Sequence, residues 1–225
     1  MKLKNLLKSF IRKSHPAYWN QLRNLQPVCS DFGFHRGTPI DRFYIEHFLK
    51  QNQSLIKGNV LEIAENTYSK KFGNGVLSCE VLHYDAKNKN ATIIGDLTKP
   101  ETLPQNKMDC FICTQTLNFI YDFKAAIKGS YQLLKPGGVM LCTVAGLCQV
   151  SKYDMDRWGD YWRFTTRSVE QIFRGIFKEV NVKSYGNVLA ATALLQGITA
   201  EELTTEELLH NDEIYQVVIT IVAVK

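Results

Sequence analysis

Acidic side chains stand at several positions where an α/β protein usually holds its ligand. Glu62 lies within the first buried strand predicted, Asp85 ends the second and Asp96 ends the third. The carboxyl ends of parallel strands meet at one edge of a sheet, where ligands bind. A carboxylate after the second strand can accept both hydroxyls of a ribose, and one after the third can accept the exocyclic amine of adenine. In succession, the two aspartates point to adenosine.

Each aspartate also has a plainer interpretation. Asp85 opens the turn-forming stretch DAKNKN, and Asp96 could cap a turn before Leu97 and Thr98. Either residue taken alone fits a turn as well as it fits a ligand. Their succession at neighbouring strand ends is what favours adenosine.

These carboxylates must be positioned by a sheet, and the hydrophobic pattern predicts one. Short apolar runs alternate with helical segments, which is typical of an α/β protein with a parallel sheet. An insertion separates the last two runs and lets the final strand turn back. We expect a Rossmann-like, doubly wound, seven-stranded sheet, mostly parallel with the last strand antiparallel, in three αβα layers. The predicted strands are 60–64, 79–84, 91–95, 108–113, 139–145, 179–184 and 215–224.

Helices are predicted from apolar spacing and from start signals. Thr38 is expected to cap one helix with Pro39 at its first position, Thr166 or Ser168 to cap another, and Thr204 or Thr205 a third. The predicted helical segments are 1–26, 40–51, 69–73, 118–134, 167–177 and part of 197–212.

Glycine-rich phosphate loops are absent from the sequence. There is no G-x-G-x-x-G and no G-x-x-x-x-G-K-S/T, which disfavours a nicotinamide oxidoreductase and a phosphate-cradling loop. The turn after the first strand instead carries Ala64, Asn66 and Tyr68. A cofactor with adenosine but no pyrophosphate, such as S-adenosylmethionine, does not need the close backbone approach that glycines allow.

The ordered series VLEI, VLHYD, GDL, DCFICTQTLNFIYD, LLKPGG and VMLCTVAG resembles the class I S-adenosylmethionine-dependent methyltransferases. Within them, RGTPIDRFYIE before the first strand, WGDYWRFT after the fifth and YGNVLAA near the end resemble one bacterial group. The resemblance spans residues 28–225. It departs from the family at the first motif, where Ala64, Asn66 and Tyr68 replace glycines.

The resemblance implies a cofactor and the residues that hold it. Glu62 matches the acid whose usual partner is the cofactor's amino group, Asp85 the ribose acid and Asp96 the adenine-contacting acid. Gln115 and Thr116 fall where the fourth-strand motif passes the methionine moiety. No metal is expected. The expected cofactor-binding residues are Arg36, Tyr44, Glu62, Ala64, Glu65, Asp85, Asp96, Leu97, Gln115 and Thr116.

The segment before the first strand could cover this cofactor. Arg36 or Arg42 could pair with the cofactor carboxylate, because guanidinium binds carboxylates in a bidentate way. Tyr44 could face the sulfonium, since a cation favours an aromatic face. In the alternative interpretation, Asp41 and Arg42 belong to a surface network and Tyr44 lies in the core.

The stretch WGDYWRFT is dense in aromatic residues and is expected to overhang the acceptor side of the site. Alternatively, its tryptophans hold a loop onto the core. Positioning and desolvation supply most of the acceleration of an SN2 methyl transfer, and an alcohol acceptor also needs a base. We expect Asp160 or His35 to act as that base, with Asp154 and His83 as further candidates.

The chain's bulk properties fit one compact unit with an extra arm. We divide its 225 residues into a helical arm at 1–57, which covers the cofactor site, and a catalytic domain at 58–225. Hydrophobic content of 45% and charged content of 22% are ordinary for a globular protein. The net charge of +5 is too modest to argue for nucleic acid.

The six cysteines suggest no disulfide framework, so a reducing, cytoplasmic setting is favoured. Cys110 and Cys113 have CxxC spacing, but an odd offset in a strand places them on opposite faces, which argues against a metal or redox pair.

The N-terminus MKLKNLLKSFIRK predicts a basic amphipathic helix. Such a helix could make a peripheral contact with the inner membrane face through residues 1–13, or pack on the domain. No apolar run reaches the roughly 18 residues that a membrane-spanning helix needs.

Together these patterns predict a methyltransferase that moves a methyl group from S-adenosylmethionine to a small-molecule or glycan-type acceptor. The glycan idea rests on the resemblance and on the N-terminus. The main alternative is a non-catalytic binding module on the same fold, which the missing glycines would permit. Nothing in the sequence indicates the oligomeric state.

Overall fold

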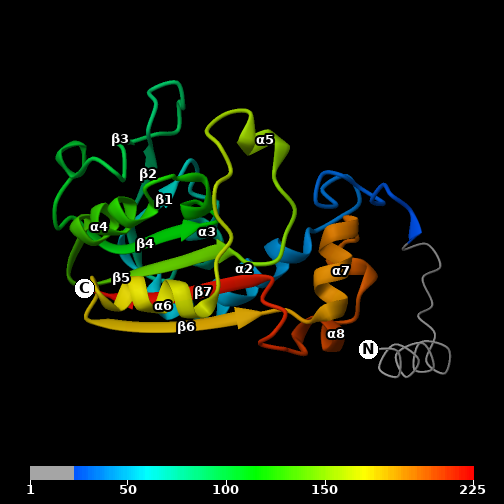
Figure 1. Ribbon diagram of the computed structural model, residues 1–225. Helices are drawn as coiled ribbons and strands as arrows, with labels where there is room; N and C mark the ends of the chain where they lie inside the picture. Colours follow the sequence, from blue (N-terminus) through cyan, green and yellow to red (C-terminus); the bar gives the residue numbers. More distant parts are fainter. Residues whose placement is uncertain (1–22) are drawn as a thin grey trace, which may run out of the picture.

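The computed structural model describes residues 23–225, which form a seven-stranded sheet with helices on both faces (Figure 1). The strand order is β3-β2-β1-β4-β5-β7-β6. β7 runs antiparallel to both of its neighbours, and the other pairs are parallel. The predicted fold class is therefore confirmed. The strands are β1 (Gly58–Ile63), β2 (Val76–His83), β3 (Ile93–Ile94), β4 (Met108–Thr114), β5 (Leu134–Ala145), β6 (Glu179–Tyr185) and β7 (Val218–Val224).

All seven strands differ from their predicted bounds by one or more residues. β3 keeps only two residues. β5 begins at Leu134 and takes in the KPGG turn, because the N–H of Gly137 donates to the carbonyl of Lys225 at 3.0 Å and extends the ladder. Gly137 has a φ of +78°, which favours glycine at that position.

The helices largely follow the predicted segments. They are α2 (Ile40–Gln51), α3 (Thr67–Phe72), α4 (Phe123–Leu133), α5 (Lys152–Met155), α6 (Thr166–Arg174), α7 (Val188–Gln196) and α8 (Thr205–Leu209). Short 3-10 turns are η2 (Gln53–Leu55), η3 (Pro100–Thr102), η4 (Leu117–Phe119) and η5 (Ala200–Glu202). α7 was not predicted, and the segment expected as one helix at 118–134 is divided into η4 and α4.

Two of the predicted helix starts were wrong. α2 begins after Pro39 without a side-chain cap, because the N–H of Thr38 donates to the Glu201 carboxylate at 2.9 Å. α6 is capped by Thr165, whose hydroxyl accepts from the N–H of Ser168. Thr204 caps α8, as predicted.

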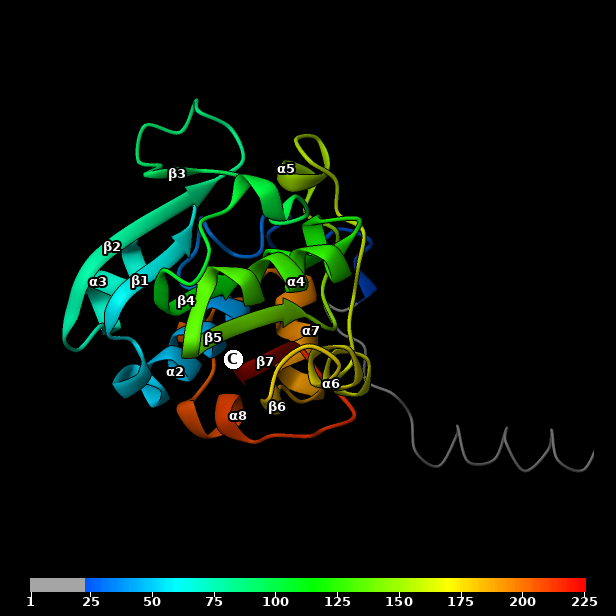
Figure 2. The ribbon, with the colours of Figure 1, turned by 90° about the vertical axis from the view of Figure 1, so that its left-hand side faces the viewer.

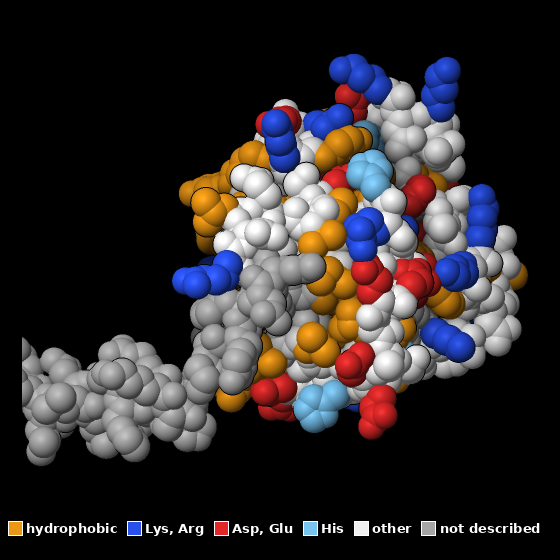
Figure 3. Space-filling model, turned by 90° about the vertical axis from the view of Figure 1, so that its right-hand side faces the viewer, with side chains coloured by type: hydrophobic (Ala, Val, Ile, Leu, Met, Phe, Trp, Pro, Cys, Tyr) orange, Lys and Arg blue, Asp and Glu red, His pale blue; other side chains and the backbone are white. Residues whose placement is uncertain are grey.

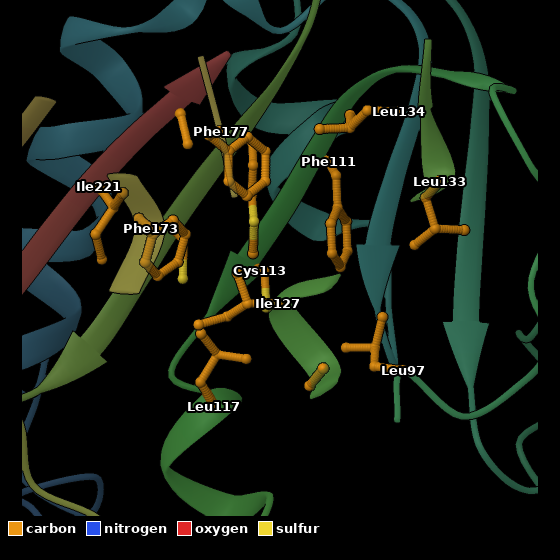
Figure 4. Packing of buried hydrophobic residues seen from close by; sticks show 14 of the residues in the cluster. Leu97, Phe111, Cys113, Leu117, Ile127, Leu133, Leu134, Phe173, Phe177 and Ile221 are labelled. Carbon is orange, nitrogen blue, oxygen red and sulfur yellow. The ribbon is translucent and has the colours of Figure 1, made fainter. Parts of the chain in front are cut away.

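Helices cover both faces of the sheet (Figures 1 and 2). α4 and α6 lie on one face, and α2, α3 and α7 lie on the other. Along β4, Phe111 and Cys113 point into one hydrophobic cluster, while Cys110 and Ile112 point into the second. Figure 4 shows the first cluster, which is built from β4, α4 and the aromatic rings of Phe173 and Phe177. The prediction that the two CxxC cysteines face opposite ways is confirmed.

The amphipathic segment predicted at residues 1–13 lies outside the described residues. Within 23–225, no helix is both long and apolar enough to cross a membrane. Figure 3 shows the side that carries α7, where hydrophobic side chains are exposed between charged ones. Val188, Leu189 and Leu195 of α7 are exposed.

Candidate cofactor and acceptor site

A cavity of about 1240 Å³ lies at the carboxyl edge of the parallel strands. Its lining includes Ala64 and Gln115, which follow β1 and β4, and Ala145, the last residue of β5. Pockets for a single ligand usually measure roughly 300–1,000 Å³, so this one has room for two molecules. In Figure 2, α5 and the loop that leads into β3 rise on the same side of the sheet.

Backbone strain is concentrated in this cavity. Four non-glycine residues of the described chain have positive φ, and three of them line the cavity: Phe32 (+52°), Ala64 (+65°) and Gln115 (+46°). Side chains disfavour this region, and such strain gathers at ligand sites. Asn66 has a φ of −120°, so it is Ala64 that adopts the left-handed turn. The glycine-poor first motif thus forms a left-handed turn without glycine.

Hydrogen bonds hold both strained turns in place. The carbonyl of Ala64 accepts from the Asn88 side chain at 2.8 Å. The N–H of Gln115 donates to the carbonyl of Thr143 at 2.9 Å, which ties the end of β4 to β5. Both turns are therefore preorganised beside the cavity.

Glu62 is buried and does not line the cavity. Its carboxylate accepts the backbone N–H groups of Tyr68, at 3.1 Å, and of Ser69 in the first turn of α3. Burial raises the pKa of this carboxyl group. Glu62 fastens α3 to β1 and so positions the turn between them.

Several expected cofactor residues meet in the cavity: Ala64, Glu65, Asp96, Leu97, Gln115 and Thr116. The Asp96 carboxylate also accepts the N–H and hydroxyl of Thr98, at 2.9 and 2.8 Å. Burial acts to raise the pKa of Asp96, but the hydrogen bonds from Thr98 lower it overall. The Asp96 side chain therefore both caps the turn at Thr98 and lines the cavity.

Asp85 is not among the residues that line the cavity. Its carboxylate accepts the N–H of Lys87 at 2.9 Å and lies 3.5 Å from the Lys87 ammonium. Its neighbours Tyr84 and Asn88 do line the cavity. The loop that carries Asp85 thus borders the cavity, while the carboxylate itself is turned toward Lys87.

The arm residues separate into two groups. Asp41 and Arg42 line the cavity, and the Arg42 guanidinium lies 5.5 Å from the ring centre of Phe34. Arg42 forms no ion pair with any of residues 23–225. Arg36 instead binds the Glu202 carboxylate through Nη2 and Nε, at 2.7 and 3.2 Å.

Tyr44 and His35 lie away from the cavity lining. Tyr44 is fully buried and donates to the carbonyl of Leu208 at 2.7 Å, as the core interpretation expected. The His35 side chain is 80% exposed, with its Nε2 3.5 Å from Asp31.

The loop between β5 and α6 is fastened over the cavity by Asp160. Its side chain is 1% exposed and forms a bidentate ion pair with Arg163, at 2.5 and 2.9 Å. It also accepts the N–H of Ser151 at 2.9 Å. Burial acts to raise the pKa of Asp160, but the Arg163 and Ser151 hydrogen bonds lower it overall. This carboxylate is committed to holding the loop.

The aromatic residues of this loop serve both of the roles considered. Trp158 and Tyr161 line the cavity. Trp162 packs against the core and donates its indole N–H to the carbonyls of Ile120 and Tyr121, at 3.2 and 3.1 Å. One tryptophan thus anchors the loop, while the other faces the cavity.

Asn118 was not predicted from the sequence as a site residue, but it lines the cavity and is 2% exposed. Its side-chain oxygen Oδ1 has no hydrogen-bond partner within residues 23–225. Tyr121 and Tyr153 also line the cavity without having been expected there. Asn118 and Tyr121 follow the fourth-strand motif within a few residues, but their burial and direction have no local pattern.

No metal centre is formed by the part of the chain that the structure describes, in which no three His, Cys, Asp or Glu side chains cluster suitably. All six cysteines are free thiols. A second, smaller hollow lies between α4 and α6, away from the strand ends.

Comparison with known proteins shows what part of the chain resembles. Residues 57–142 match the family model of a methyltransferase domain. A S-adenosylmethionine-dependent methyltransferase from Archaeoglobus fulgidus is 11% identical, with a TM-score of 0.52 over 82% of this chain and 94% of that chain. A possible histamine N-methyltransferase from Thermotoga maritima is 16% identical, with a TM-score of 0.55 over 83% of this chain and 91% of that chain. A methyltransferase from Mesorhizobium loti is 14% identical, with a TM-score of 0.54 over 83% of this chain and 98% of that chain.

At these identities the solved structures establish the fold, and the domain match covers residues 57–142. Together they support a methyltransferase enzyme whose cofactor is S-adenosylmethionine. No curated protein matches the chain. The site fits this cofactor, because strained turns at Ala64 and Gln115 and the carboxylate of Asp96 border one cavity.

Proposed function

We propose that the chain transfers a methyl group from S-adenosylmethionine to a small-molecule or glycan-type acceptor. The observation that carries this proposal is the large cavity at the ends of β1 and β4, bounded by strained turns at Ala64 and Gln115. A cavity with room for two molecules suits a reaction between a cofactor and an acceptor. The glycan option also rests on the resemblance of RGTPIDRFYIE and WGDYWRFT to one bacterial group.

We assign the cofactor-binding residues along this edge. Asp96 and Leu97 would contact the adenine, and Asp85 would accept the ribose hydroxyls after turning from Lys87. Ala64, Glu65, Gln115 and Thr116 would border the methionine part. Glu62 would position the turn after β1 by fixing the start of α3, without touching the cofactor. Arg42 lines the cavity, whereas Arg36 lies outside the lining and is paired with Glu202. This difference favours Arg42 over Arg36 as the partner of the cofactor carboxylate.

When bound, the cofactor supplies an electrophilic methyl on a sulfonium, which an acceptor lone pair takes while the C–S electrons leave on sulfur. The chain's own part is to orient the two molecules and exclude water. The ion pair with Arg163 favours a positioning role for Asp160 over the base role expected for it. His35 would reach a reacting group only after movement of its exposed loop. An amine acceptor that arrives unprotonated has a free lone pair and needs no base to attack the methyl group.

We further propose that the arm at 1–57 covers the cofactor while the domain at 58–225 carries the sheet. Phe32, Phe34 and Arg42 of the arm line the cavity, which supports this role. We also infer a peripheral membrane contact through residues 1–13 and a location on the cytoplasmic side.

A ligand panel tests the proposed function. Calorimetry with S-adenosylmethionine, S-adenosylhomocysteine and NAD should show binding of the first two and none of NAD. A non-catalytic module that does not hold the cofactor would bind none of the three, and an oxidoreductase would bind NAD. Failure of both sulfur compounds to bind would sink the proposal.

Two matched arginine variants test the assignment of the carboxylate partner. Arg42→Ala should weaken S-adenosylhomocysteine binding about tenfold, because it removes one charge-assisted pair worth about 1.5 kcal/mol. Arg36→Ala should leave the affinity within about twofold, since its charge is already paired with Glu202. Equal losses in the two variants would contradict the assignment. Asp85→Ala should also weaken binding if that residue holds the ribose.

A further inference from the structure

The buried oxygen of Asn118 needs a donor that the described chain does not supply. Asn118 lies in η4, directly beyond β4, and lines the cavity. Its Oδ1 accepts no hydrogen bond within residues 23–225 although the residue is 2% exposed. Buried polar atoms in native proteins are nearly always paired, because an unpaired one loses its hydration without compensation. A donor from a bound molecule would satisfy this oxygen.

The backbone around Asn118 is held rigidly. Its carbonyl accepts the N–H groups of Tyr161 and Trp162, at 2.9 and 3.2 Å. These bonds join η4 to the loop that Asp160 and Arg163 fasten. Asn118 therefore sits at the junction of two cavity walls, where its side chain is preorganised for recognition.

Two pairs of partly exposed aromatic side chains line the same cavity as Asn118. Tyr121 and Tyr161 are 72% and 48% exposed and meet edge to face, with ring centres 5.5 Å apart. Trp158 and Tyr153 form a second such pair, 6.2 Å apart. All four line the cavity. Large aromatic surfaces left open at a cavity are suited to stack on a planar or sugar ring.

Charge narrows the choice of ring compound. The charges of Asp160 and Arg163 neutralise each other. Among the other lining residues, Arg42 is outnumbered by carboxylates, so the cavity carries negative charge. An acceptor with carboxylate or phosphate groups would meet like charge here, which disfavours it. The carboxylates in the lining, Asp160 included, are Asp31, Asp41, Glu65, Asp96, Asp122, Asp154 and Asp160.

We propose that Asn118, with Tyr121, Trp158 and Tyr161, forms the acceptor subsite for a neutral or cationic ring compound that donates an O–H or N–H to Asn118 Oδ1. This inference rests on the proposed function and narrows its acceptor class. Sugar rings and aromatic rings share the chemistry, so the test carries one arm for each.

The test measures probe binding to protein saturated with S-adenosylhomocysteine, by saturation-transfer NMR and titration. The probes are methyl β-glucoside and tyramine, with glucuronate and 4-hydroxybenzoate as anionic counterparts. At least one of the first two should bind, with transfer strongest at its ring protons, and the anions should bind at least tenfold more weakly. Binding of the glucoside alone would indicate a sugar acceptor, and binding of tyramine alone an aromatic one.

Asn118→Leu keeps the branched shape and the number of side-chain heavy atoms and removes the oxygen. The variant should bind the probe at least tenfold more weakly and bind S-adenosylhomocysteine with unchanged affinity. It should melt at or above the wild-type temperature, because an unpaired buried oxygen is lost. Trp158→Ala should also lower the affinity for the same probe. Asn181→Leu, at an exposed position of β6, is the control. It should change neither the affinity for the probe nor that for S-adenosylhomocysteine.

The inference would be overturned if the wild-type protein bound neither the neutral nor the cationic probe, or if it bound the anionic counterparts equally well. Unchanged affinity of the Asn118→Leu variant for the probe would overturn it too. Loss of S-adenosylhomocysteine affinity in Asn118→Leu would place the oxygen on the cofactor and overturn it as well. If the wild-type protein binds no S-adenosylhomocysteine at all, the proposed function itself fails, and this inference fails with it.

Discussion

Ala64 and Gln115 hold backbone conformations that glycine normally takes. A left-handed φ costs a residue with a Cβ about 1–2 kcal/mol. The fold tolerates the cost because hydrogen bonds to Asn88 and Thr143 fix both turns. The loss of glycine from the first motif therefore changes the energy of the turn more than its shape.

Ala64→Gly tests this account at the residue scale. Relief of the strain should outweigh the extra freedom of glycine in the unfolded chain, for a net gain of about 0.5 kcal/mol in the free energy of unfolding. Ala125→Gly in α4 is the matched control and should lose about 0.5–1 kcal/mol, because its backbone is helical. Urea denaturation measures both. A loss in Ala64→Gly would show that the turn is unstrained.

At the scale of the element, the loop between β5 and α6 depends on one buried ion pair. Asp160 joins Arg163 to the N–H of Ser151 and so closes the loop on itself. Trp162 then ties the loop to the carbonyls after η4. The loop carries the aromatic wall of the cavity, so its attachment positions that wall.

Asp160→Asn should lower the free energy of unfolding at pH 7 by about 3 kcal/mol, because it leaves Arg163 without its partner. The folded pKa of Asp160 is lowered. Its contribution is therefore present above the unfolded pKa of about 3.9 and is lost as pH falls through the folded value. Denaturation at pH 7 and pH 3 should show the difference from wild type shrinking in acid.

Glu170→Gln in the exposed pair with Arg174 provides the comparison, with an expected loss of about 0.5 kcal/mol. A pH-independent loss in Asp160→Asn would instead indicate a packing effect. S-adenosylhomocysteine affinity should survive in Asp160→Asn if the residue positions the loop and does not hold the cofactor.

At the scale of the whole molecule, charge is concentrated near one end of the sequence. Lys2, Lys4, Lys8, Arg12 and Lys13 fall within the first thirteen residues. Each basic residue near an anionic surface contributes about 1 kcal/mol of attraction. The full chain should therefore sediment with phosphatidylglycerol vesicles at low salt and be released by high salt. Deletion of residues 1–13 should abolish sedimentation and leave cofactor affinity intact.

Phosphatidylcholine vesicles serve as the neutral control. Sedimentation of the full chain with neither kind of vesicle would refute the membrane contact. Equal sedimentation with both kinds would show that apolar burial, and not charge, drives it.

Local pattern was enough to predict the sheet. Short apolar runs alternating with helical segments predicted the seven strands, and the insertion before the last run predicted the antiparallel β7. The odd offset within one strand predicted the opposite faces of Cys110 and Cys113. These features depend on neighbours in the sequence and on burial, which periodicity reports directly. For the same reason the edge that carries Ala64, Asp96 and Gln115 could be located in advance.

The direction of individual side chains depended on partners far along the chain. Arg36 is drawn from the cavity by Glu202, 166 positions away, and Tyr44 by the carbonyl of Leu208. The carbonyl of Asn118 accepts the N–H groups of Tyr161 and Trp162, which lie on a distant loop. No local pattern encodes such contacts, since a hydrogen bond is set by atoms that meet only after packing. The positions of the strand ends could thus be predicted from the sequence, while tertiary contacts determine which side chains face the cavity.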